Sequence, residues 1–86
     1  MNTDEVGEIQ SRVNKCLIET LDLDPNEINP RANLRGLGID SLAAVEMAMG
    51  LEDEFEIEAP IDEIENLKTM QDVYTFIERQ IATLQT

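Results

Sequence analysis

Residues 37–55 read LGIDSLAAVEMAMGLEDEF, and this stretch decides the fold of the chain. Asp40 is a residue type that caps helix N-termini well, and Gly38 lets the backbone turn sharply just before it. The apolar residues that follow recur every three or four positions, which is the period of an α-helix. We therefore expect a tight turn and then a helix that begins at Asp40 or Ser41 and ends near Phe55.

Two apolar stripes run along this expected helix. The members of one stripe are Ala44, Ala48, Leu51 and Phe55. The members of the other stripe are Leu42, Val45 and Met49. A surface helix needs only one stripe to pack on its own core. We interpret the second stripe, with acidic residues between or beside its members, as a surface that meets a partner. The alternative is a helix that lies deep in the domain and buries both stripes.

The chain before this helix predicts a first helix and a long loop. Thr3 is expected to cap the first helix. The apolar residues of this helix recur at helical spacing; they are Val6, Ile9, Val13, Leu17 and Leu21. Residues 22–40 are expected to form a loop with a single helical turn, in which Asp24 is the cap and Pro25 the first residue. The apolar residues expected to hold this loop in place are Ile28, Leu34 and Leu37.

The chain after Phe55 predicts a short helix and a long one. Pro60 ends the helical pattern, because the residue before a proline is pushed out of helical geometry. Residues 61–66 are expected to form one short helical piece. Residues 69–72, TMQD, resemble the start of a capping box, and a last apolar stripe follows at Met70, Val73, Ile77, Ile81 and Leu84. The fold class is therefore all-α.

The charge and composition limit the functions open to the chain. Six basic and nineteen acidic residues give a net charge of −13. Such a surface repels the phosphates of nucleic acids and anionic lipids, and it attracts basic patches on other proteins. The alternative is that the charge only keeps a small domain soluble. The chain has no histidine, which removes Ser-His-Asp chemistry, Cys-His chemistry and most transition-metal sites.

The length and the cysteine content further limit the domain organisation and the chemistry open to the chain. A chain of 86 residues is one domain at most, with a thin core. No apolar run approaches membrane-spanning length, and the acidic N-terminus lacks the apolar segment of a signal peptide. The single Cys16 cannot form an internal disulfide, and its helical surroundings indicate a small core residue and not a nucleophile. A reducing cytoplasm is the expected location.

Residues 37–42 strongly resemble the attachment motif of the acyl carrier protein family, a Leu-Gly-x-Asp-Ser-Leu pattern at a loop-to-helix junction. The resemblance continues through residues 45–47 and 51–55, Pro60, the acidic residues 62–65 and the last helix. The first helix is similar in pattern and not in residues. By its position alone, Ser41 would be explained as a helix cap. The motif, the acidity and the order of the helices together carry the resemblance.

The resemblance implies a single acyl carrier domain over residues 1–86, folded as a four-helix up-down bundle with three longer helices and a short third helix. It implies that a phosphopantetheinyl transferase moves 4′-phosphopantetheine from coenzyme A onto the hydroxyl of Ser41, next to Asp40 and Leu42. The thiol of this arm would then hold an acyl group as a thioester. The protein would be a substrate of many enzymes and not an enzyme itself, without catalytic residues or a metal site.

The partners implied are the transferase and acyl-processing enzymes, such as synthases, reductases and acyltransferases, with basic docking patches. The residues expected to meet them are the apolar Leu42, Val45 and Met49 and the acidic Glu46, Glu52 and Asp53. Exposed ion pairs contribute only about 0–1 kcal/mol each, so docking is expected to be weak and fast. We expect a monomer that neither binds nucleic acid nor inserts into membranes.

An acyl chain is expected to bind among apolar residues of the core. The alternative is that these residues form a closed core. They are Ala44, Ala48, Phe55, Ile57, Ala59, Ile64 and Leu67. Several positions depart from the common fatty-acid carrier pattern. Ala43, Ile61 and the pair Arg35-Gly36 stand where acidic residues are frequent, and Gly50 weakens its helix by about 1 kcal/mol relative to Ala. These departures leave the pathway open between fatty-acid, polyketide and other secondary biosynthesis.

Two other classes of protein fit parts of the sequence. Asp22, Asp24 and Asn26 alternate as in a helix–loop–helix calcium loop. That loop requires Gly at its sixth position and Glu at its twelfth, where this chain has Glu27 and Asn33, so the motif fails. A regulatory module that binds a basic partner without modification would keep the helices and leave Ser41 as a plain cap. A catalytic function is disfavoured, because the sequence has no group of residues that could act as a general base or bind a catalytic metal.

Overall fold

The computed structural model describes residues 2–84, with side chains from Gly7 onward, and this range is all-α. Its elements are α1 (Asn2–Leu21), the 3₁₀ turn η1 (Pro25–Glu27), α2 (Ser41–Phe55), α3 (Ile61–Ile64) and α4 (Met70–Leu84). The three longer helices and the short third helix are confirmed. The last helical residue of α3 is Ile64, two residues earlier than predicted. The predicted cap at Thr3 lies outside the described side chains.

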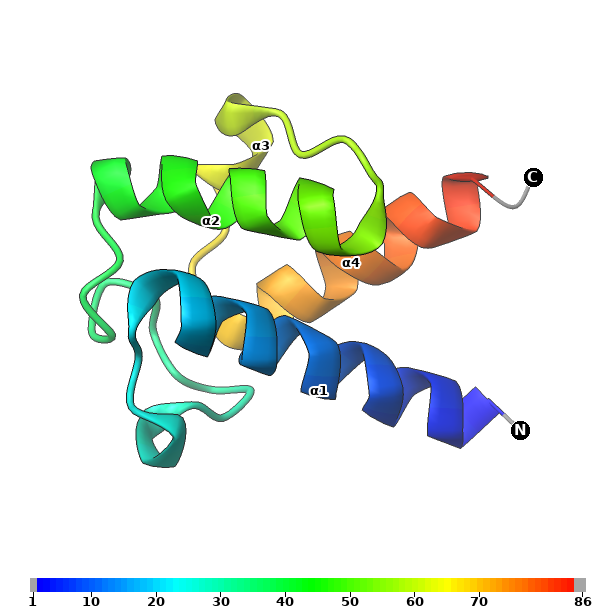
Figure 1. The fold of residues 1–86 in the computed structure, drawn as a ribbon, viewed down its shortest axis with the longest axis horizontal. Coiled ribbons are helices and arrows are strands. Elements are labelled where there is room, and N and C mark those ends of the chain that lie inside the picture. The colour runs from blue at the N-terminus through cyan, green and yellow to red at the C-terminus, as the bar shows by residue number, and fades with distance from the viewer. Residues whose placement is uncertain (1, 85–86) are drawn as a thin grey trace.

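The helices are arranged as an up-down bundle. Figure 1 shows α1 and α2 side by side and running in opposite directions, with α3 above α2 and α4 packed behind α1. Residues 56–69, which include α3, return the chain so that α4 runs in the same direction as α2. The start of α2 and the long loop therefore share one end of the bundle, opposite the two termini (Figure 1). No helix within the described range is long and apolar enough to cross a membrane.

One hydrophobic core fills the space between the helices. The residues that α2 contributes are Ala44, Met47, Ala48, Leu51 and Phe55, so the first apolar stripe faces the core as predicted. The largest side chain with almost no exposure is Tyr74 of α4. Its hydroxyl donates a hydrogen bond to Asn14 Oδ1 at 2.6 Å, and burial raises the pKa of this phenol. A satisfied polar group therefore joins α1 to α4 inside the core.

The long loop is fixed to the start of α4 by backbone hydrogen bonds. Leu34 N–H donates to the carbonyl of Lys68 at 2.8 Å, beside an isolated antiparallel bridge between Asn33 and Thr69. Ile39 N–H donates back to the carbonyl of Leu34 at 3.0 Å, and both side chains are buried. The long loop is therefore fixed to the segment just before α4, and it leads from there to the start of α2.

The predicted helical turn inside this loop is confirmed. Asp24 is the N-cap of η1, and its Oδ1 accepts a hydrogen bond from Asn26 N–H at 2.9 Å. Leu34 is buried, and Ile28 and Leu37 pack half-buried against the core, as expected.

The helix α4 begins with the capping box that the sequence predicts. Thr69 Oγ1 accepts a hydrogen bond from Asp72 N–H at 3.2 Å. The Asp72 carboxylate in return accepts hydrogen bonds from the N–H groups of Lys68 at 3.0 Å and Thr69 at 3.1 Å. These backbone donors stabilise the charged carboxylate and hold the pKa of Asp72 below its usual value.

The Asp72→Asn variant is expected to lose stability in a pH-dependent way. The folded-state pKa of Asp72 is lower than the unfolded-state pKa, so its charge stabilises the fold above about pH 4 and this contribution disappears as the pH falls through the folded-state pKa. We expect a loss of roughly 0.5–1 kcal/mol at neutral pH, because the carboxylate is partly exposed. Urea unfolding at about pH 7 and about pH 3 checks this. An equal difference at both pH values would contradict it.

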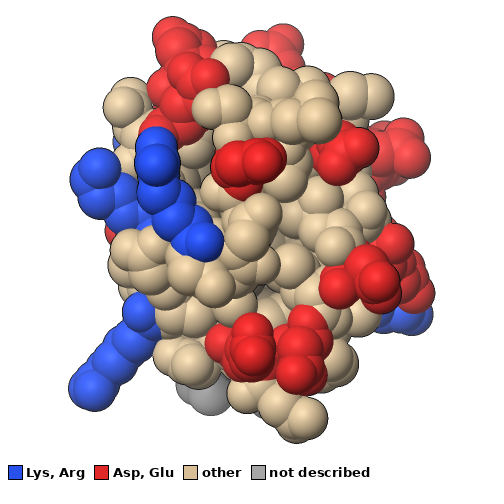
Figure 2. Space-filling model, turned by 90° about the vertical axis from the view of Figure 1, so that its left-hand side faces the viewer, with Lys and Arg blue, Asp and Glu red and all other residues tan. Residues whose placement is uncertain are grey.

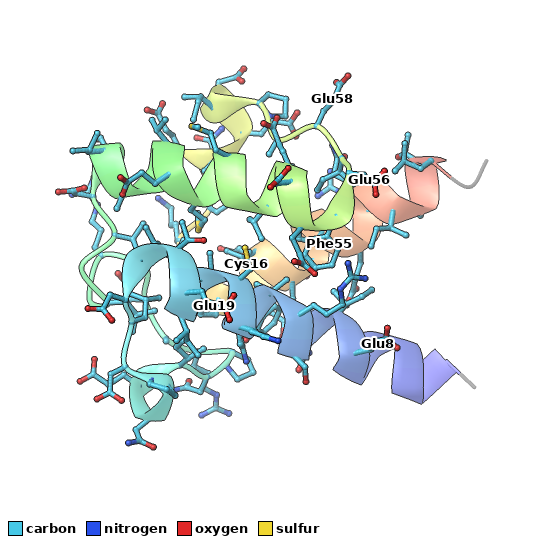
Figure 3. All side chains as sticks on the ribbon, in the orientation of Figure 1. Glu8, Cys16, Glu19, Phe55, Glu56 and Glu58 are labelled. Atoms are coloured by element: carbon cyan, nitrogen blue, oxygen red, sulfur yellow. The ribbon has the colours of Figure 1, made fainter. Side chains whose placement is uncertain are left out.

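The interface between α1 and α2 is close-packed at Cys16 and Gly50. Figure 3 shows Cys16 pointing from α1 toward α2. Its thiol is buried, and burial raises its pKa, so it packs the core as predicted. A Cβ atom added to Gly50 would lie 3.1 Å from Thr20 Oγ1 and 3.3 Å from Cys16 Sγ. Gly50 therefore lets the two helices approach closely, a role that its low helix propensity does not indicate.

Candidate functional site

Ser41 is the first residue of α2 and is exposed at the loop end of the bundle. The N-cap is the residue before it, because Asp40 has an extended backbone and its Oδ1 accepts a hydrogen bond from Ala43 N–H at 2.9 Å. The Ser41 hydroxyl makes no hydrogen bond within the described part of the chain. Asp40 therefore performs the capping, and the hydroxyl of Ser41 is available at the positive end of the helix dipole.

Gly38 produces the turn that precedes α2. Its φ of 91° lies in the left-handed region, and its N–H donates to the carbonyl of Arg35 at 3.0 Å. No atom lies within 4 Å of a Cβ built on Gly38, so the backbone conformation and not the space requires glycine here. The predicted turn is confirmed, and the surface beside it is open.

The second apolar stripe of α2 faces outward. The exposed fractions are 72% for Leu42, 37% for Val45 and 63% for Met49. The alternative in which α2 buries both stripes is therefore wrong. Glu46 and Asp53 are also exposed on this helix. We refer to these five residues, Leu42, Val45, Glu46, Met49 and Asp53, as the outer face of α2.

Glu52 differs from the other residues predicted to meet partners. It is half-buried, and its Oε2 accepts a hydrogen bond from Ala59 N–H at 2.9 Å. The chain between these residues turns at Glu56, which has a positive φ of 55°. Glu52 therefore ties α2 to the segment that leads into α3. Sequence reasoning missed this contact because it depends on how the chain folds back after the helix.

A pocket of about 490 Å³ adjoins Ser41 between the start of α2, the long loop and the end of α3. Its buried apolar residues are Leu34, Ile39, Ala44, Met47 and Ile64. Its exposed residues include Arg35, Asp40, Ser41, Glu65 and Lys68. The pocket therefore combines an apolar interior with a charged rim, and Ser41 belongs to that rim.

The predicted pocket residues separate into two groups in the structure. Ala44, Ile64 and Leu67 line the pocket beside Ser41. Ala48, Phe55, Ile57 and Ala59 are buried in the core and do not line it. The pocket is therefore at the Ser41 end of the bundle and does not extend along α2 to Phe55.

The charges are distributed unevenly over the end of the molecule that carries this pocket. Figure 2 shows most of the visible Lys and Arg side chains on the left of that end, with Asp and Glu side chains directly above them and across the rest of the view. Arg12 forms an ion pair with the end of α2: its Nε lies 3.0 Å from Glu54 Oε2. Its guanidinium also lies 4.5 Å from the centre of the Phe55 ring.

Two of the residues that suggested a calcium loop have other structural roles. The Asp24 carboxylate caps η1, and Asp22 has a positive φ of 59° at the end of α1. Among the described residues, no group of three His, Cys, Asp or Glu side chains converges as metal ligands would.

Comparison with known proteins agrees with this geometry. The family model described as "Phosphopantetheine attachment site" matches residues 11–77. The chain is 42% identical over 77 residues to an acyl carrier protein of Thermosynechococcus vestitus, covering 88% of this chain and 95% of that protein. It is 41% identical over 78 residues to an acyl carrier protein of Caulobacter vibrioides, covering 90% of this chain and all of that protein. The crystal structure of an acyl carrier protein from Thermotoga maritima has the same fold, with a TM-score of 0.81, 19% identity and coverage of 93% and 94% of the two chains.

The family match and these relatives define a protein that carries a covalently attached phosphopantetheine arm. The chain belongs to the acyl carrier protein family. It carries acyl groups on this arm and is not an enzyme. Phosphopantetheinyl transferases and acyl-processing enzymes are accordingly its partners.

Proposed function

We propose that Ser41 is the residue that carries the arm. The observation that supports this most strongly is that Asp40 caps α2, which leaves the Ser41 hydroxyl exposed and without an internal partner in the described chain. A phosphate bonded to that oxygen would lie at the N-terminus of a fifteen-residue helix, where the helix dipole favours negative charge. The residues present therefore fit the group.

Three residues of the motif have distinct roles in this proposal. The arm supplies a thiol that holds the acyl group as a thioester. Ser41 anchors the arm, Asp40 fixes the start of α2 and lies where the transferase acts, and Leu42 presents an apolar side chain directly beside the anchor. The apolar pocket next to Ser41 offers shelter to an acyl chain, with about 0.8 kcal/mol gained for each methylene buried.

We propose the outer face of α2 as the surface that docks partner enzymes with basic patches. Its apolar side chains are exposed, and the chain carries a net charge of −13. An apolar centre with acidic residues around it suits a weak complex in which charge accelerates association. We propose that Glu52, next to the outer face, also contacts partner enzymes, although its carboxylate accepts the Ala59 hydrogen bond.

The Met49→Ala variant is expected to raise the KM of a phosphopantetheinyl transferase for this protein by about three- to tenfold, with kcat little changed. Met49 is 63% exposed, so its removal takes contact area from the complex and not from the core. The control is Leu84→Ala, which removes another exposed apolar side chain on α4. Initial-rate kinetics measure both variants, and equal effects of the two would contradict the docking proposal.

Several other properties of the protein remain predictions. They are a single carrier domain over residues 1–86, a monomeric state, a cytoplasmic location, and the absence of nucleic-acid binding and of membrane insertion. The pathway stays open between fatty-acid, polyketide and related biosynthesis.

The carrier function is tested by loading the protein. The apo-protein is incubated with Mg²⁺, a broad-specificity phosphopantetheinyl transferase and hexanoyl-coenzyme A, and its intact mass is measured. We expect a gain of one hexanoyl-phosphopantetheine, from which hydroxylamine removes the hexanoyl group alone. A correctly folded protein that gains nothing with several transferases would overturn the proposal.

A further inference from the structure

An open hollow lies between the end of α1 and the outer face of α2. Its volume is about 630 Å³. The residues that line it are Thr20 of α1 and Glu46, Met49, Gly50, Glu52 and Asp53 of α2. It shares no residue with the pocket beside Ser41. The helix α1 therefore contributes a wall to the surface that we propose for docking, which the sequence alone does not indicate.

The hollow is centred on Gly50. Residues three and four positions apart lie on the same face of a helix, so Glu46 and Asp53 lie on either side of Gly50 along α2. Because Gly50 has no side chain, this row of side chains is interrupted at its middle. Thr20 closes the hollow on the α1 side, since its Oγ1 lies 3.1 Å from a Cβ atom built on Gly50. Met49, which is 63% exposed, stands beside the gap.

The charge around the hollow is negative. Glu46 and Asp53 are both exposed, and among the described residues no Lys or Arg lines the hollow. The one ion pair in the described part of the chain joins Arg12 to Glu54. Neither Glu46 nor Asp53 therefore forms an ion pair within this part of the chain, and both carboxylates remain available to a cation from outside.

The negative field extends to the interface of the two helices beneath the hollow. Cys16 Sγ lies 3.3 Å from a Cβ atom built on Gly50. The pKa of the Cys16 thiol is raised, chiefly by burial and further by the charges of Glu54, Glu19 and Asp53. These carboxylates come from both helices, since Glu19 belongs to α1 and the other two to α2. A positive charge placed in the hollow would therefore be attracted from both of its sides.

We infer that the hollow at Gly50 receives a long cationic side chain, lysine or arginine, from the partner enzyme, the phosphopantetheinyl transferase included. Such a side chain covers apolar surface with its methylene groups while its head stays charged and polar. The methylene groups would lie on Met49 and on the backbone at Gly50, and the head would reach Glu46 or Asp53. This inference rests on the proposed docking at the outer face of α2. It adds Thr20 of α1 as a residue that determines which partners fit.

The test changes the charge at Thr20, which is exposed one residue before the end of α1. Thr20→Lys places a cation in the wall of the hollow, and Thr20→Glu places a carboxylate there. We expect the KM of the transferase for Thr20→Lys to exceed that for Thr20→Glu by about tenfold, with kcat little changed. The uncharged Thr20→Gln, of similar length, should have a KM between the two, which separates charge from size.

The matched control is the same pair of substitutions at Thr75, which is exposed on α4 and does not line the hollow. Thr75→Lys and Thr75→Glu change the net charge by the same amounts, so they measure the long-range effect of charge on association. Their KM values should differ by no more than about threefold. Circular dichroism confirms that all five variants are folded.

The outcomes separate this inference from the proposals on which it rests. An unmodified sequence that gains no arm would count against the carrier site. An unchanged KM for Met49→Ala would count against docking at the outer face of α2. If Met49→Ala raises the KM, but the Lys-to-Glu ratio of KM values at Thr20 is no larger than the ratio at Thr75, this inference alone is overturned.

Discussion

The Ser41→Ala variant is expected to gain no phosphopantetheine, whereas the Ser11→Ala variant should gain as much as the unmodified sequence. These are the two serines of the chain, and both are exposed. Ser11 lies within α1, whereas Ser41 lies at the start of α2, beside the outer face and the pocket. The loss in Ser41→Ala should be complete, since the substitution removes the oxygen to which the phosphate would bond.

The variant is expected to remain folded. Ser41 is exposed, its hydroxyl has no internal partner in the described chain, and alanine is a good helix former, so stability should change by no more than about 0.5 kcal/mol. Intact mass after incubation with the transferase measures the modification, and circular dichroism confirms the fold. If folded Ser41→Ala still gained the arm, another residue would be the anchor.

The Leu51→Ala variant is expected to lose about 2–5 kcal/mol of unfolding free energy. Leu51 has no exposed surface and lies on the face of α2 that packs into the core. A domain of this length has a total stability of roughly 4–13 kcal/mol, so the variant should lose a large part of it and unfold at a markedly lower urea concentration. Urea unfolding followed by circular dichroism measures the change.

The matched control for Leu51→Ala is Leu42→Ala. The same side chain is removed from the same helix, but Leu42 is 72% exposed, and its loss should change stability by no more than about 0.5 kcal/mol. Equal destabilisation by the two variants would mean that both stripes of α2 are buried. That result would contradict the assignment of the second stripe to the surface.

The features of the fold that depend on local chemistry could be predicted from the sequence. The start of α2 follows from Asp40 and Gly38, and the start of α4 follows from the reciprocal hydrogen bonds of Thr69 and Asp72. Helical spacing also separated the buried stripe of α2 from the exposed one. In each case the residues that interact lie within a few positions of each other, so their spacing in the sequence carries the information.

The features that depend on distant residues could not be predicted. The bond from Leu34 to Lys68 joins positions far apart in the chain, so nothing local indicates that Arg35 and Lys68 lie at one pocket. The close approach of α1 at Gly50 has the same origin. The predicted pocket included Ala48 and Phe55 because small and apolar residues favour a cavity in principle, whereas tight packing fills that part of the core.

The most direct measurement of the central claim is a tryptic peptide map of the modified protein. Trypsin cleaves after Arg35 and Lys68, and residues 36–68 form one peptide whose only hydroxyl side chain is Ser41. Ser11 lies in a separate peptide that ends at Arg12. We predict that the peptide of residues 36–68 alone gains the mass of one phosphopantetheine. An arm found on any other peptide, with residues 36–68 unmodified, would contradict the account.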